Sequence, residues 1–515
     1  MPPSLAIAAG NEMNARAAAN VARAGGNAVD ACLAAAVMAW VAEPFFASIC
    51  GSGFVIVRDP DGRVEAIDGN TVMPLTVPSE PGQGLRRIYV PDYSDGLYTG
   101  IGSGSVAVPG ALAAVHEAWR RHGHIEWAAL FADAVAAARD GIPMPRTSAY
   151  YLSVTYERLW SLYPESRAVF APHGTPLREG DPLVQTELAD ALEIVAGRGP
   201  QALYDGELGK EVADAIAADG GFLTASDLAP YRAEVRAPVE TSAFGWRVTS
   251  NPPPAVGGAV LVHMLALLDG ADLSDPVARL SAIVEAQRAS TTYRSEKYED
   301  PGEIAGALDE VLLELRGRGP GSASVGESSE TLRRSAARSP ETTHASTADA
   351  DGYLCSLTES NGYGAGMVVH GMLLNNALGE EELNPLGTHR LPPGSRCHSN
   401  MAPTIAAGPD RVVSIGSPGA TRIVSAIAQT LVRLAVDGET LDDAVAAPRA
   451  HLDPRPDGET LCYEPGLPGD RLGYRPRPYD ELHMFFGGVN AASVSHDGVV
   501  EAAHDPRRSG ARALV

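Results

Sequence analysis

An abrupt change of composition at Thr342 is the feature that most constrains the fold of this chain. Residues 317–340 are rich in Gly, Ser and Arg and contain very few apolar side chains, which is typical of a linker. Directly after them, residues 342–347 and 353–358 form two strand-like runs around a turn sequence, which predicts a β-hairpin. A linker that leads straight into a buried strand beginning with Thr is the pattern expected of an internal processing site.

A cut before Thr342 would place a free α-amine beside the hydroxyl of the same residue. One residue would then supply both the nucleophile and its base. Taken alone, Thr342 is more simply interpreted as a β-branched residue that opens a strand. His344 lies two positions further along and therefore points to the same face, where it would buttress Thr342, so we leave it outside the predicted catalytic set.

Chain length and charge narrow the class of protein. A chain of 515 residues exceeds the limit for one core, which is roughly 250–300 residues, so it needs two lobes or one large layered sandwich. Its hydrophobic content of 45% and charged content of 20% are those of a globular protein. The net charge of −24 argues against a nucleic-acid partner, which would require clustered basic side chains.

The N-terminal segment has no basic region before its short apolar stretch, which argues against a secretory signal. No apolar run approaches the length of about 18 residues that suggests a membrane span. The five cysteines are scattered and never spaced as CxxC, which favours reduced thiols over a disulfide framework or a zinc site. We therefore expect a cytoplasmic protein with no structural metal, no cofactor and no membrane partner.

Helix and strand periodicities alternate along the rest of the chain. Residues 11–40 predict two helices joined at Gly25-Gly26, and residues 49–67 predict a strand, a turn and a returning strand. Residues 110–141 predict two helices that break near Gly123. We also expect helix up to about residue 219, strands over 106–109, 232–248, 367–375 and 411–415, and helices over 259–268 and 423–435. The alternation indicates an α/β or layered α+β fold.

Seven motifs resemble, in order, those of the γ-glutamyltranspeptidase family. They are Gly25-Gly-Asn-Ala-Val-Asp-Ala31, Glu43-Pro44, Val106-Ala-Val-Pro-Gly110, Thr342-Thr-His344, Leu373-Leu-Asn-Asn376, Met401-Ala-Pro-Thr-Ile405 and Gly416-Ser-Pro-Gly419. Each motif is weak by itself, but together they cover nearly the whole chain. The resemblance implies an α+β fold, namely the four-layer αββα sandwich of N-terminal-nucleophile (Ntn) hydrolases.

The same resemblance implies that the chain is a precursor that cuts itself between Glu341 and Thr342. The large subunit would be residues 1–341, ending in the flexible linker 317–341, and the small subunit would be residues 342–515. The two fragments would stay together as a heterodimer. Thr342 would then act as the nucleophile, and its new α-amine would act as the base.

Two further elements complete the implied catalytic machinery. Ser360 stands at the position of a second hydroxyl residue that hydrogen-bonds the nucleophile, although a solvated loop serine is about equally expected there. The backbone N–H groups of Gly419 and Ala420 would stabilise the oxyanion of a tetrahedral intermediate. The family has two glycines at these positions, so the role requires a backbone conformation that accommodates the Cβ of Ala420. By itself, this run would be interpreted as a plain strand-to-helix turn.

The implied substrate positions depart from the family pattern. Asn70 replaces the arginine that holds the α-carboxylate of a γ-glutamyl group. Ala377 replaces a polar residue, and Glu380 supplies the family carboxylate only if its loop shifts. The family Ser-Ser pair is Ser399-Asn400, and the loop after Asn361 is two residues shorter. We therefore predict substrate contacts from Asn70, Asn361, Glu380, Ser399 and Asn400 in a pocket rewritten for a substrate other than glutathione.

This combination is similar to an actinobacterial antibiotic-pathway branch of the family, which hydrolyses a carbon–carbon bond while making the 4-alkyl-proline units of lincosamides and pyrrolobenzodiazepines. Thr342 would attack a ketone of a small-molecule, pyrroline-type substrate, whose conjugation would delocalise the departing carbanion. One alternative is a γ-glutamyl hydrolase or transpeptidase for glutathione-like amides, anchored by an arginine from elsewhere in the chain. Another is an unprocessed, inactive homologue with a binding role.

Overall fold

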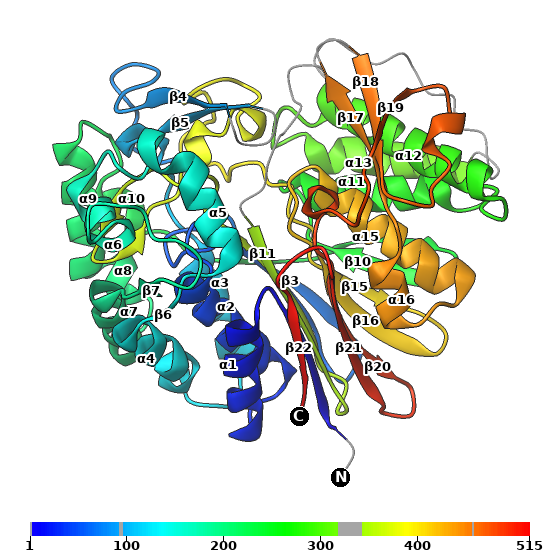
Figure 1. The fold of residues 1–515 in the computed structure, drawn as a ribbon, viewed down its shortest axis with the longest axis horizontal. Helices are drawn as coiled ribbons and strands as arrows, with labels where there is room; N and C mark the ends of the chain where they lie inside the picture. Colours follow the sequence, from blue (N-terminus) through cyan, green and yellow to red (C-terminus); the bar gives the residue numbers. More distant parts are fainter. Residues whose placement is uncertain (1–2, 92–95, 318–341, 456–457) are drawn as a thin grey trace.

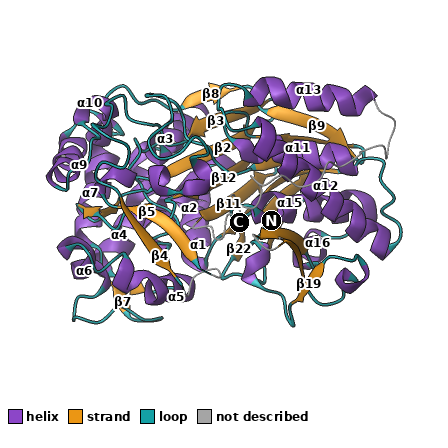
Figure 2. Ribbon diagram, turned by 90° about the horizontal axis from the view of Figure 1, so that it is seen from above, coloured by secondary structure: helices purple, strands orange, loops and turns teal. Residues whose placement is uncertain are grey.

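Two β-sheets stacked face to face form the centre of the molecule, and helices cover both outer faces (Figure 1, Figure 2). The computed structural model describes residues 3–91, 96–317, 342–455 and 458–515. Its layers run helix, sheet, sheet, helix, which confirms the predicted α+β class and four-layer αββα sandwich. The predicted linker 317–341 lies, apart from Gly317, outside the described residues, so the division of the chain before Thr342 stays a prediction.

The first sheet contains the predicted hairpin that begins at Thr342. Its seven strands run in the order β22 (Ala511–Leu514), β1 (Leu5–Ala9), β11 (Thr342–Asp349), β12 (Leu354–Ser360), β2 (Ser52–Arg58), β3 (Val64–Gly69) and β8 (Glu234–Arg236). All neighbouring strands are antiparallel. The first strand of the chain, β1, lies between β11 and the last strand, β22, so the segment that begins at Thr342 lies in the interior of the sheet (Figure 1).

The second sheet packs against the inner face of the first. Its six strands run in the order β21 (Val500–His504), β20 (Asn490–Ser495), β16 (Arg411–Gly416), β15 (Thr404–Ala407), β10 (Trp246–Ser250) and β9 (Val239–Ala243). Small and β-branched side chains fill the space between the two sheets, among them Ala6, Ala8, Ile56, Ala348, Ile405, Val412, Ala492 and Val494. This contact brings the end of β16 close to the start of β11, which matters for the site.

Two Ala-rich helices cover the outer face of the first sheet. These are α1 (Glu12–Arg23) and α2 (Ala28–Ala42), and every residue of α2 is buried. The turn between them uses Gly25 at a φ of 98°, which a residue without a side chain adopts most readily. Asn27 and Asp30 then form a capping box at the start of α2. The Gly-Gly-Asn motif is therefore explained by the connection between these helices.

The remaining helices extend these outer layers. α3 (Ala111–His122) packs beside α2, against β2 and β3 of the first sheet. The other helices on this side of the molecule are α4 (Ala132–Asp140), α5 (Arg146–Thr155), α6 (Pro164–Phe170), α7 (Thr186–Arg198), α8 (Gln201–Tyr204), α9 (Glu207–Ala218) and α10 (Ala225–Leu228). Those beside the second sheet are α11 (Val256–Leu268), α12 (Pro276–Lys297), α13 (Ile304–Gly317), α15 (Arg422–Val432) and α16 (Leu441–Ala446). The smaller strands are β4 (Arg86–Val90), β5 (Leu97–Ile101), β6 (Ile142–Pro143), β7 (Pro182–Leu183), β17 (Ala450–Arg455), β18 (Gly458–Tyr463) and β19 (Arg475–Pro478).

Three local predictions need correction. Residues 106–109 form one β-bridge, between Val108 and Val72, instead of a strand, because this segment crosses the end of the sheet as a loop. Residues 367–375 form the two short strands β13 (Val368–Val369) and β14 (Met372–Leu373), since Gly371 turns the chain at a φ of 70°. The helix expected over 423–435 ends at Val432, and a π-helical turn follows it.

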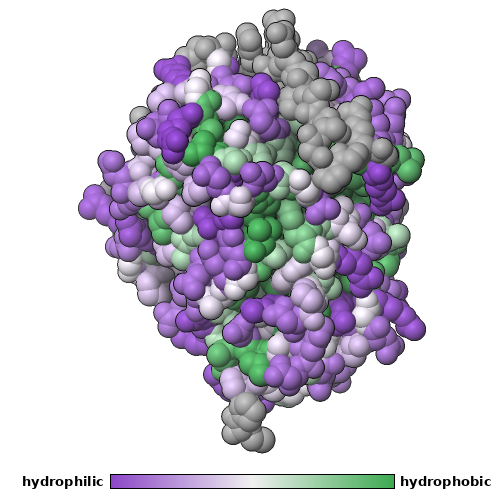
Figure 3. Space-filling model, turned by 90° about the vertical axis from the view of Figure 1, so that its right-hand side faces the viewer, coloured by the Kyte–Doolittle hydropathy of each residue, from purple (hydrophilic) through white to green (hydrophobic). Residues whose placement is uncertain are grey.

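The face shown in Figure 3 is mostly hydrophilic, and its apolar side chains form small groups between polar ones. In the parts of the chain that the structure describes, no helix is both long enough and apolar enough to cross a membrane. All five cysteines are free and buried.

Candidate active site

Three neighbouring strands of the first sheet each place a hydroxyl residue at the same edge. Thr342 opens β11, Ser360 closes β12 and Ser52 opens β2. The register pairs Thr342 with Ser360 and Ser360 with Ser52, so the three residues form one row across the sheet. Directly opposed residues on antiparallel strands present their side chains on the same face. The predicted hairpin is therefore what places Ser360 next to Thr342.

This row of hydroxyl groups opens into a pocket, hereafter the Thr342 pocket. All the predicted site residues except Gly419 line it, namely Asn70, Thr342, Ser360, Asn361, Glu380, Ser399, Asn400 and Ala420. Sequence reasoning missed Ser52, Glu382 and His398, which also line the wall. The pairing of β2 with β12 could have identified Ser52, whereas no local signal marks Glu382, which lies in a single 3₁₀ turn, or His398, which lies in a loop.

The turn between β16 and α15 supplies the predicted oxyanion donors. Gly419 has a φ of 141°, and Ala420 has a φ of 44°, in the left-handed region that a residue with a Cβ rarely adopts. Holding Ala420 there costs about 1–2 kcal/mol. Within the described part of the chain, no protein group accepts a hydrogen bond from the N–H of either residue. The turn thus accommodates the Cβ of Ala420 and leaves both N–H groups without a described protein partner, and of the two residues Ala420 lines the pocket.

A second loop braces this turn from behind. The N–H of Gly488 donates to Ser417 Oγ at 3.0 Å, and Ser417 Oγ donates to the carbonyl of Pro418 at 2.7 Å. A Cβ placed on Gly419 would lie only 3.3 Å from the Cα of Gly487. The loop around residue 487 therefore sets the position of the peptide groups that are the candidate oxyanion donors.

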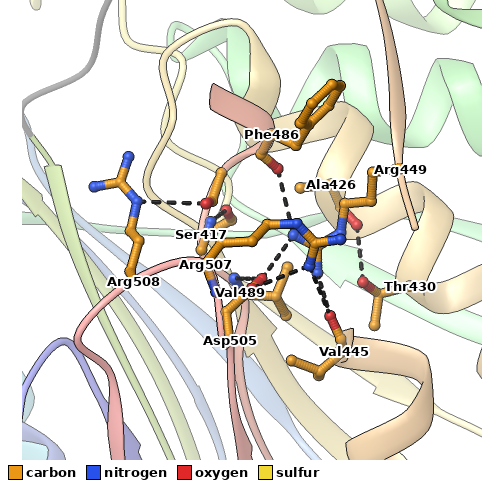
Figure 4. A network of polar contacts seen from close by, with 12 residues as sticks. Ser417, Ala426, Thr430, Val445, Arg449, Phe486, Val489, Asp505, Arg507 and Arg508 are labelled. Atoms are coloured by element: carbon orange, nitrogen blue, oxygen red, sulfur yellow. Dashed lines mark hydrogen bonds and ion pairs between the residues drawn. The ribbon is translucent and has the colours of Figure 1, made fainter. Parts of the chain in front are cut away.

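Three arginines hold the carbonyl groups of this loop. Arg422 donates to Phe485 at 3.2 Å, Arg449 donates to Phe486 at 3.3 Å, and Arg508 donates to the carbonyl of residue 487 at 3.4 Å. Figure 4 shows the Arg449 and Arg508 side chains converging on the loop from opposite sides. Because carbonyl groups accept and guanidinium groups donate, the loop is fixed by charge-assisted hydrogen bonds.

A buried cluster of four charges anchors one of these contacts, that of Arg449. Arg449 contacts Asp505 at 2.6 Å, and Arg507 contacts Asp505 at 3.0 Å and also pairs with Glu464. The side chains of these residues are at most 2% exposed. Burial would raise the pKa of Asp505, but the two arginines outweigh it and hold that pKa below its usual value. Asp505 also accepts the N–H of Val489 at 2.8 Å, which ties the cluster to the loop.

His344 lies beneath the Thr342 pocket and does not line it. Its two ring nitrogens are 2.8 Å from the hydroxyls of Thr358 and Ser346, and Gly416 of β16 packs against the ring. Burial lowers the pKa of His344 to about 3, so the ring is neutral at physiological pH. With both nitrogens occupied, His344 packs the start of β11 against β16, as a buttress would.

The side of β11 that faces away from the pocket is held by Glu43. Thr343 donates its hydroxyl to Glu43 Oε2 at 2.5 Å, and Asn14 donates to the same oxygen at 2.7 Å. Burial raises the pKa of Glu43, although these hydrogen bonds oppose the shift. The Glu43-Pro44 motif thus fixes the first residues of β11 from behind, which restrains the backbone of Thr342.

The amide of Asn70 is already engaged within the protein. Its Nδ2 donates to the carbonyl of Cys397 at 2.5 Å, and its Oδ1 accepts the N–H of Thr71 at 2.9 Å. The nearby Arg396 is held by Asp68 at 3.3 Å and by Tyr231 at 2.9 Å, and it does not line the Thr342 pocket. Among the described residues that line this pocket, none is an arginine. The arginine anchor that a γ-glutamyl enzyme would need is therefore missing from the described wall.

Other polar atoms of the pocket lack partners. Asn361 is fully buried, yet neither its Oδ1 nor its Nδ2 has a hydrogen-bond partner in the described structure. The same holds for Asn400 Oδ1 and His398 Nε2. Leaving such an atom buried without a partner costs about 1–3 kcal/mol. A bound molecule with uncharged polar groups would satisfy these atoms, so they mark the binding side of the pocket.

The Asn375-Asn376 motif has a different role. Asn375 bridges the carbonyls of Cys50 and Ala107 and accepts the N–H of Ala107, while Asn376 accepts the N–H groups of Tyr363 and Gly364. These bonds fix the loops around the pocket. The loop that follows brings Glu380 to the wall, where its carboxylate packs against the backbone after Asn361.

Comparison with known proteins agrees with this architecture. The family model described as Gamma-glutamyltranspeptidase matches residues 14–515. The Acylase ACY 1 proenzyme of Pseudomonas sp. (strain SE83) is 31% identical, over 96% of this chain and 90% of its own. The Glutathione hydrolase proenzyme of Bacillus subtilis (strain 168) is 28% identical, over 98% of this chain and 90% of its own.

Solved structures share the fold. Cephalosporin acylase from Bacillus halodurans superposes with a TM-score of 0.82 at 24% identity, covering 99% of this chain and 96% of its own. The structure of LmbA2991T421A gives a TM-score of 0.82 at 21% identity, covering 100% of this chain and 99% of its own. The chain therefore belongs to the gamma-glutamyltranspeptidase family.

Proposed function

We propose that this chain is a self-processing Ntn hydrolase that uses Thr342 to form an acyl-enzyme with a substrate lacking a γ-glutamyl end. The observation that carries the proposal is the content of one pocket. Thr342, Ser360 and Ala420 meet there, while no arginine lines its described wall. The pocket thus contains groups that suit the chemistry of the family, but its described wall has no arginine that would bind a glutamyl carboxylate.

The first step of the proposed mechanism is cleavage between Glu341 and Thr342, which gives subunits 1–341 and 342–515 as a heterodimer. The hydroxyl of Thr342 then attacks a substrate carbonyl, and the new α-amine of the same residue takes the proton. The N–H groups of Gly419 and Ala420 stabilise the oxyanion, a contribution worth about 3–4 kcal/mol for one donor in comparable enzymes. Collapse releases the leaving group, and a water molecule activated by the α-amine hydrolyses the ester.

The substrate side of the pocket supports a ligand with uncharged polar groups. Asn361 and Asn400 present unpartnered amide atoms, and Ala377 contributes an apolar surface. The amide of Asn70 already makes hydrogen bonds to the backbone through both its nitrogen and its oxygen, so it has little hydrogen-bonding capacity left for a ligand. An α-carboxylate placed beside these groups would lack the bidentate partner that a carboxylate prefers.

For the bond cleaved, we favour the carbon–carbon bond of a conjugated, pyrroline-type intermediate of 4-alkyl-proline biosynthesis. Thr342 would attack a ketone, and the carbon–carbon bond would break with its electron pair passing into the conjugated system. The proton held by the α-amine of Thr342 would then pass to the carbanion of the leaving group. The acyl group would remain on Thr342 as an ester. The departures at Asn70 and Ala377 support this choice because they remove the contacts for a glutamyl group.

Amide hydrolysis is the second candidate, and the relative at 31% identity favours it, since that protein is an acylase. The catalytic groups would be the same. The leaving amine would take its proton from the α-amine of Thr342, and no conjugation would be needed.

One set of assays tests the proposal. Denaturing gels should show two fragments for the wild type and one for Thr342→Ala. The processed enzyme should then release an acyl acid from a dienyl pyrroline ketone, and mass spectrometry of the small fragment should show the acyl adduct on Thr342. Preferential turnover of neutral acyl anilides would favour the acylase candidate. Turnover of γ-glutamyl-p-nitroanilide alone would contradict the non-glutamyl assignment.

A further inference from the structure

We propose that the cavity adjoining the Thr342 pocket is a second subsite, hereafter the Arg294 subsite, which binds a carboxylate group of the substrate remote from the cleaved bond. The two cavities share Glu382 and His398 in their walls. A substrate that places its carbonyl at Thr342 can therefore extend past these two residues into the second cavity. This inference rests on the proposed function, because it names a chemical feature of the same enzyme's substrate.

The Arg294 subsite is built mainly from one helix and one strand. α12 contributes Gln287, Thr291 and Arg294, and β17 contributes His451 and Asp453. Gln287 is within 3.0 Å of His451 Nδ1 and donates to the carbonyl of Leu452 at 3.0 Å, so helix and strand are tied together beside the cavity. The cavity is thus part of the folded framework.

Arg294 is a half-buried cation in this wall, and its guanidinium group makes no hydrogen bond or ion pair with any described residue. The other arginines near the site differ, since Arg396, Arg449 and Arg507 each contact a carboxylate within the protein. A guanidinium group has five N–H donors and binds a carboxylate in a bidentate geometry. A partly desolvated guanidinium without a partner therefore favours an anionic ligand.

Carboxylates in the same wall do not cancel this charge. Asp453 is paired with Arg455 at 2.9 Å, and Glu299 is exposed to solvent. Glu382 lies close enough to interact electrostatically with Arg294, but burial raises its pKa to about 7, so it is only partly ionised near pH 7. In the described wall of this cavity, Arg294 therefore supplies the positive charge that can pair with an anionic ligand.

The predicted ligand feature differs from the glutamyl α-carboxylate of the family. That group would be held at the position of Asn70, which lies in the Thr342 pocket and not in the Arg294 subsite. The structure therefore points to a substrate whose carboxylate is separated from the scissile bond by several atoms.

Matched pairs of chromogenic substrates test this inference. The first series pairs the succinyl, glutaryl and adipoyl mono-p-nitroanilides with their methyl esters. In these acids the carboxylate lies on the acyl side of the cleaved bond. The second compares butyryl anilides of 3-aminobenzoate and of its methyl ester, which places it on the leaving-group side. We expect at least one acid to have a lower KM than its ester in the wild type. Arg294→Gln should raise that KM about tenfold and leave the ester unchanged.

Arg288→Gln is the matched control, because Arg288 lies on the same helix, contacts Glu285 at 2.8 Å and lines neither cavity. It should keep the preference for the acid. Thermal unfolding should be similar for wild type and Arg294→Gln near pH 7, since the substitution removes no hydrogen bond or ion pair within the described protein and only the interaction with a partly ionised Glu382 is lost. Equal KM values for acid and ester in the wild type, or a preference that survives Arg294→Gln, would overturn the inference.

A binding measurement separates this inference from the proposed function. Calorimetry with succinate, glutarate and adipate, and with glutaramide as the neutral control, requires no turnover. Binding of a dicarboxylate that disappears in Arg294→Gln supports the subsite even if none of the tested substrates is cleaved. Turnover through Thr342 without any binding of these anions would uphold the catalytic assignment and refute the subsite.

Discussion

The two sides of the Thr342 pocket are built in opposite ways. On the catalytic side, Thr342 and the oxyanion turn are braced by Glu43, by His344 and by the buried charge cluster of Arg449 and Asp505. On the substrate side, Asn361, Asn400 and His398 keep polar atoms without partners in the described structure. The internal contacts of the chain position the proposed nucleophile Thr342, whereas the polar atoms on the substrate side are left without protein partners in the described structure.

This contrast separates how a bond is attacked from which molecule is bound. Groups that act in the transition state must be fixed before the substrate arrives, because preorganised donors need no rearrangement during the reaction. Groups that recognise a ligand must instead be left unsatisfied until it binds. A change on the catalytic side should therefore affect kcat and folding, whereas a change on the substrate side should affect KM with little effect on folding.

The largest effect is expected from Thr342→Ala. The substitution removes the attacking hydroxyl, so both chain cleavage and turnover should be lost, with a fall in kcat of at least about 10⁴-fold by analogy with other nucleophile deletions. Thr342→Ser is the control, since it keeps the hydroxyl and should retain both activities at a reduced rate. Gel electrophoresis and steady-state assays measure the two effects. Processing in the alanine variant would show that another group performs the attack.

Asp505→Asn should give the next largest effect, this time on folding. It leaves Arg449 and Arg507 buried with a weakened partner, and breaking such a pair costs about 3–5 kcal/mol. Denaturant unfolding should show this loss, and kcat should fall because the loop behind the oxyanion turn loosens.

The pKa of Asp505 also fixes a pH dependence. Because the native pKa lies below its usual value, the stabilisation is present above the unfolded pKa of about 4 and is lost as pH falls through the native value. The asparagine variant should therefore lose less stability between pH 5 and acid than the wild type. An equal acid sensitivity of the two proteins would show that this cluster does not bear the charge we assign to it.

Much of the fold was predictable because its signals are local. The hairpin from Thr342 to Ser360 follows from alternation around a turn, and the register then places Ser360 opposite Thr342. The Gly-rich run at Gly416–Gly419 predicts a strand-to-helix turn for a similar reason, whereas its oxyanion role is implied only by the family resemblance. Pattern and turn chemistry thus locate the strand ends and turns at which the proposed catalytic residues lie.

The rest of the site depends on contacts between distant segments. Arg449 and Asp505 meet across 56 positions of sequence, and a charged pair of this kind is indistinguishable in sequence from solvated surface residues. Glu382 and Arg294 lie in separate segments whose approach is set by the packing of α12. The prediction of a strand over 106–109 was wrong because tertiary contacts hold that segment as a loop.

On the substrate side, Asn361→Ala should change binding much more than folding. The buried amide of Asn361 has no partner in the described structure, so its removal relieves a desolvation cost that offsets the small cavity created. We expect the free energy of unfolding to stay within about 1 kcal/mol of the wild type, while KM rises about tenfold. A loss of stability like that of Asp505→Asn would contradict the division between the two sides.

The smallest effect is expected from the titration of Glu382. Burial raises its pKa from 4.5 to about 7 against the opposing charges of Arg294 and Arg422, while the neighbouring Glu381 raises it slightly further. The native state then holds a proton that the unfolded chain releases, so stability should fall as pH rises from about 4.5 to about 7. Glu382→Gln should remove this slope. In the wild type, ionised Glu382 also competes for Arg294, so the KM of an acid substrate should rise modestly above pH 7, and a flat KM profile from pH 6 to 8 would show that Glu382 does not face the ligand.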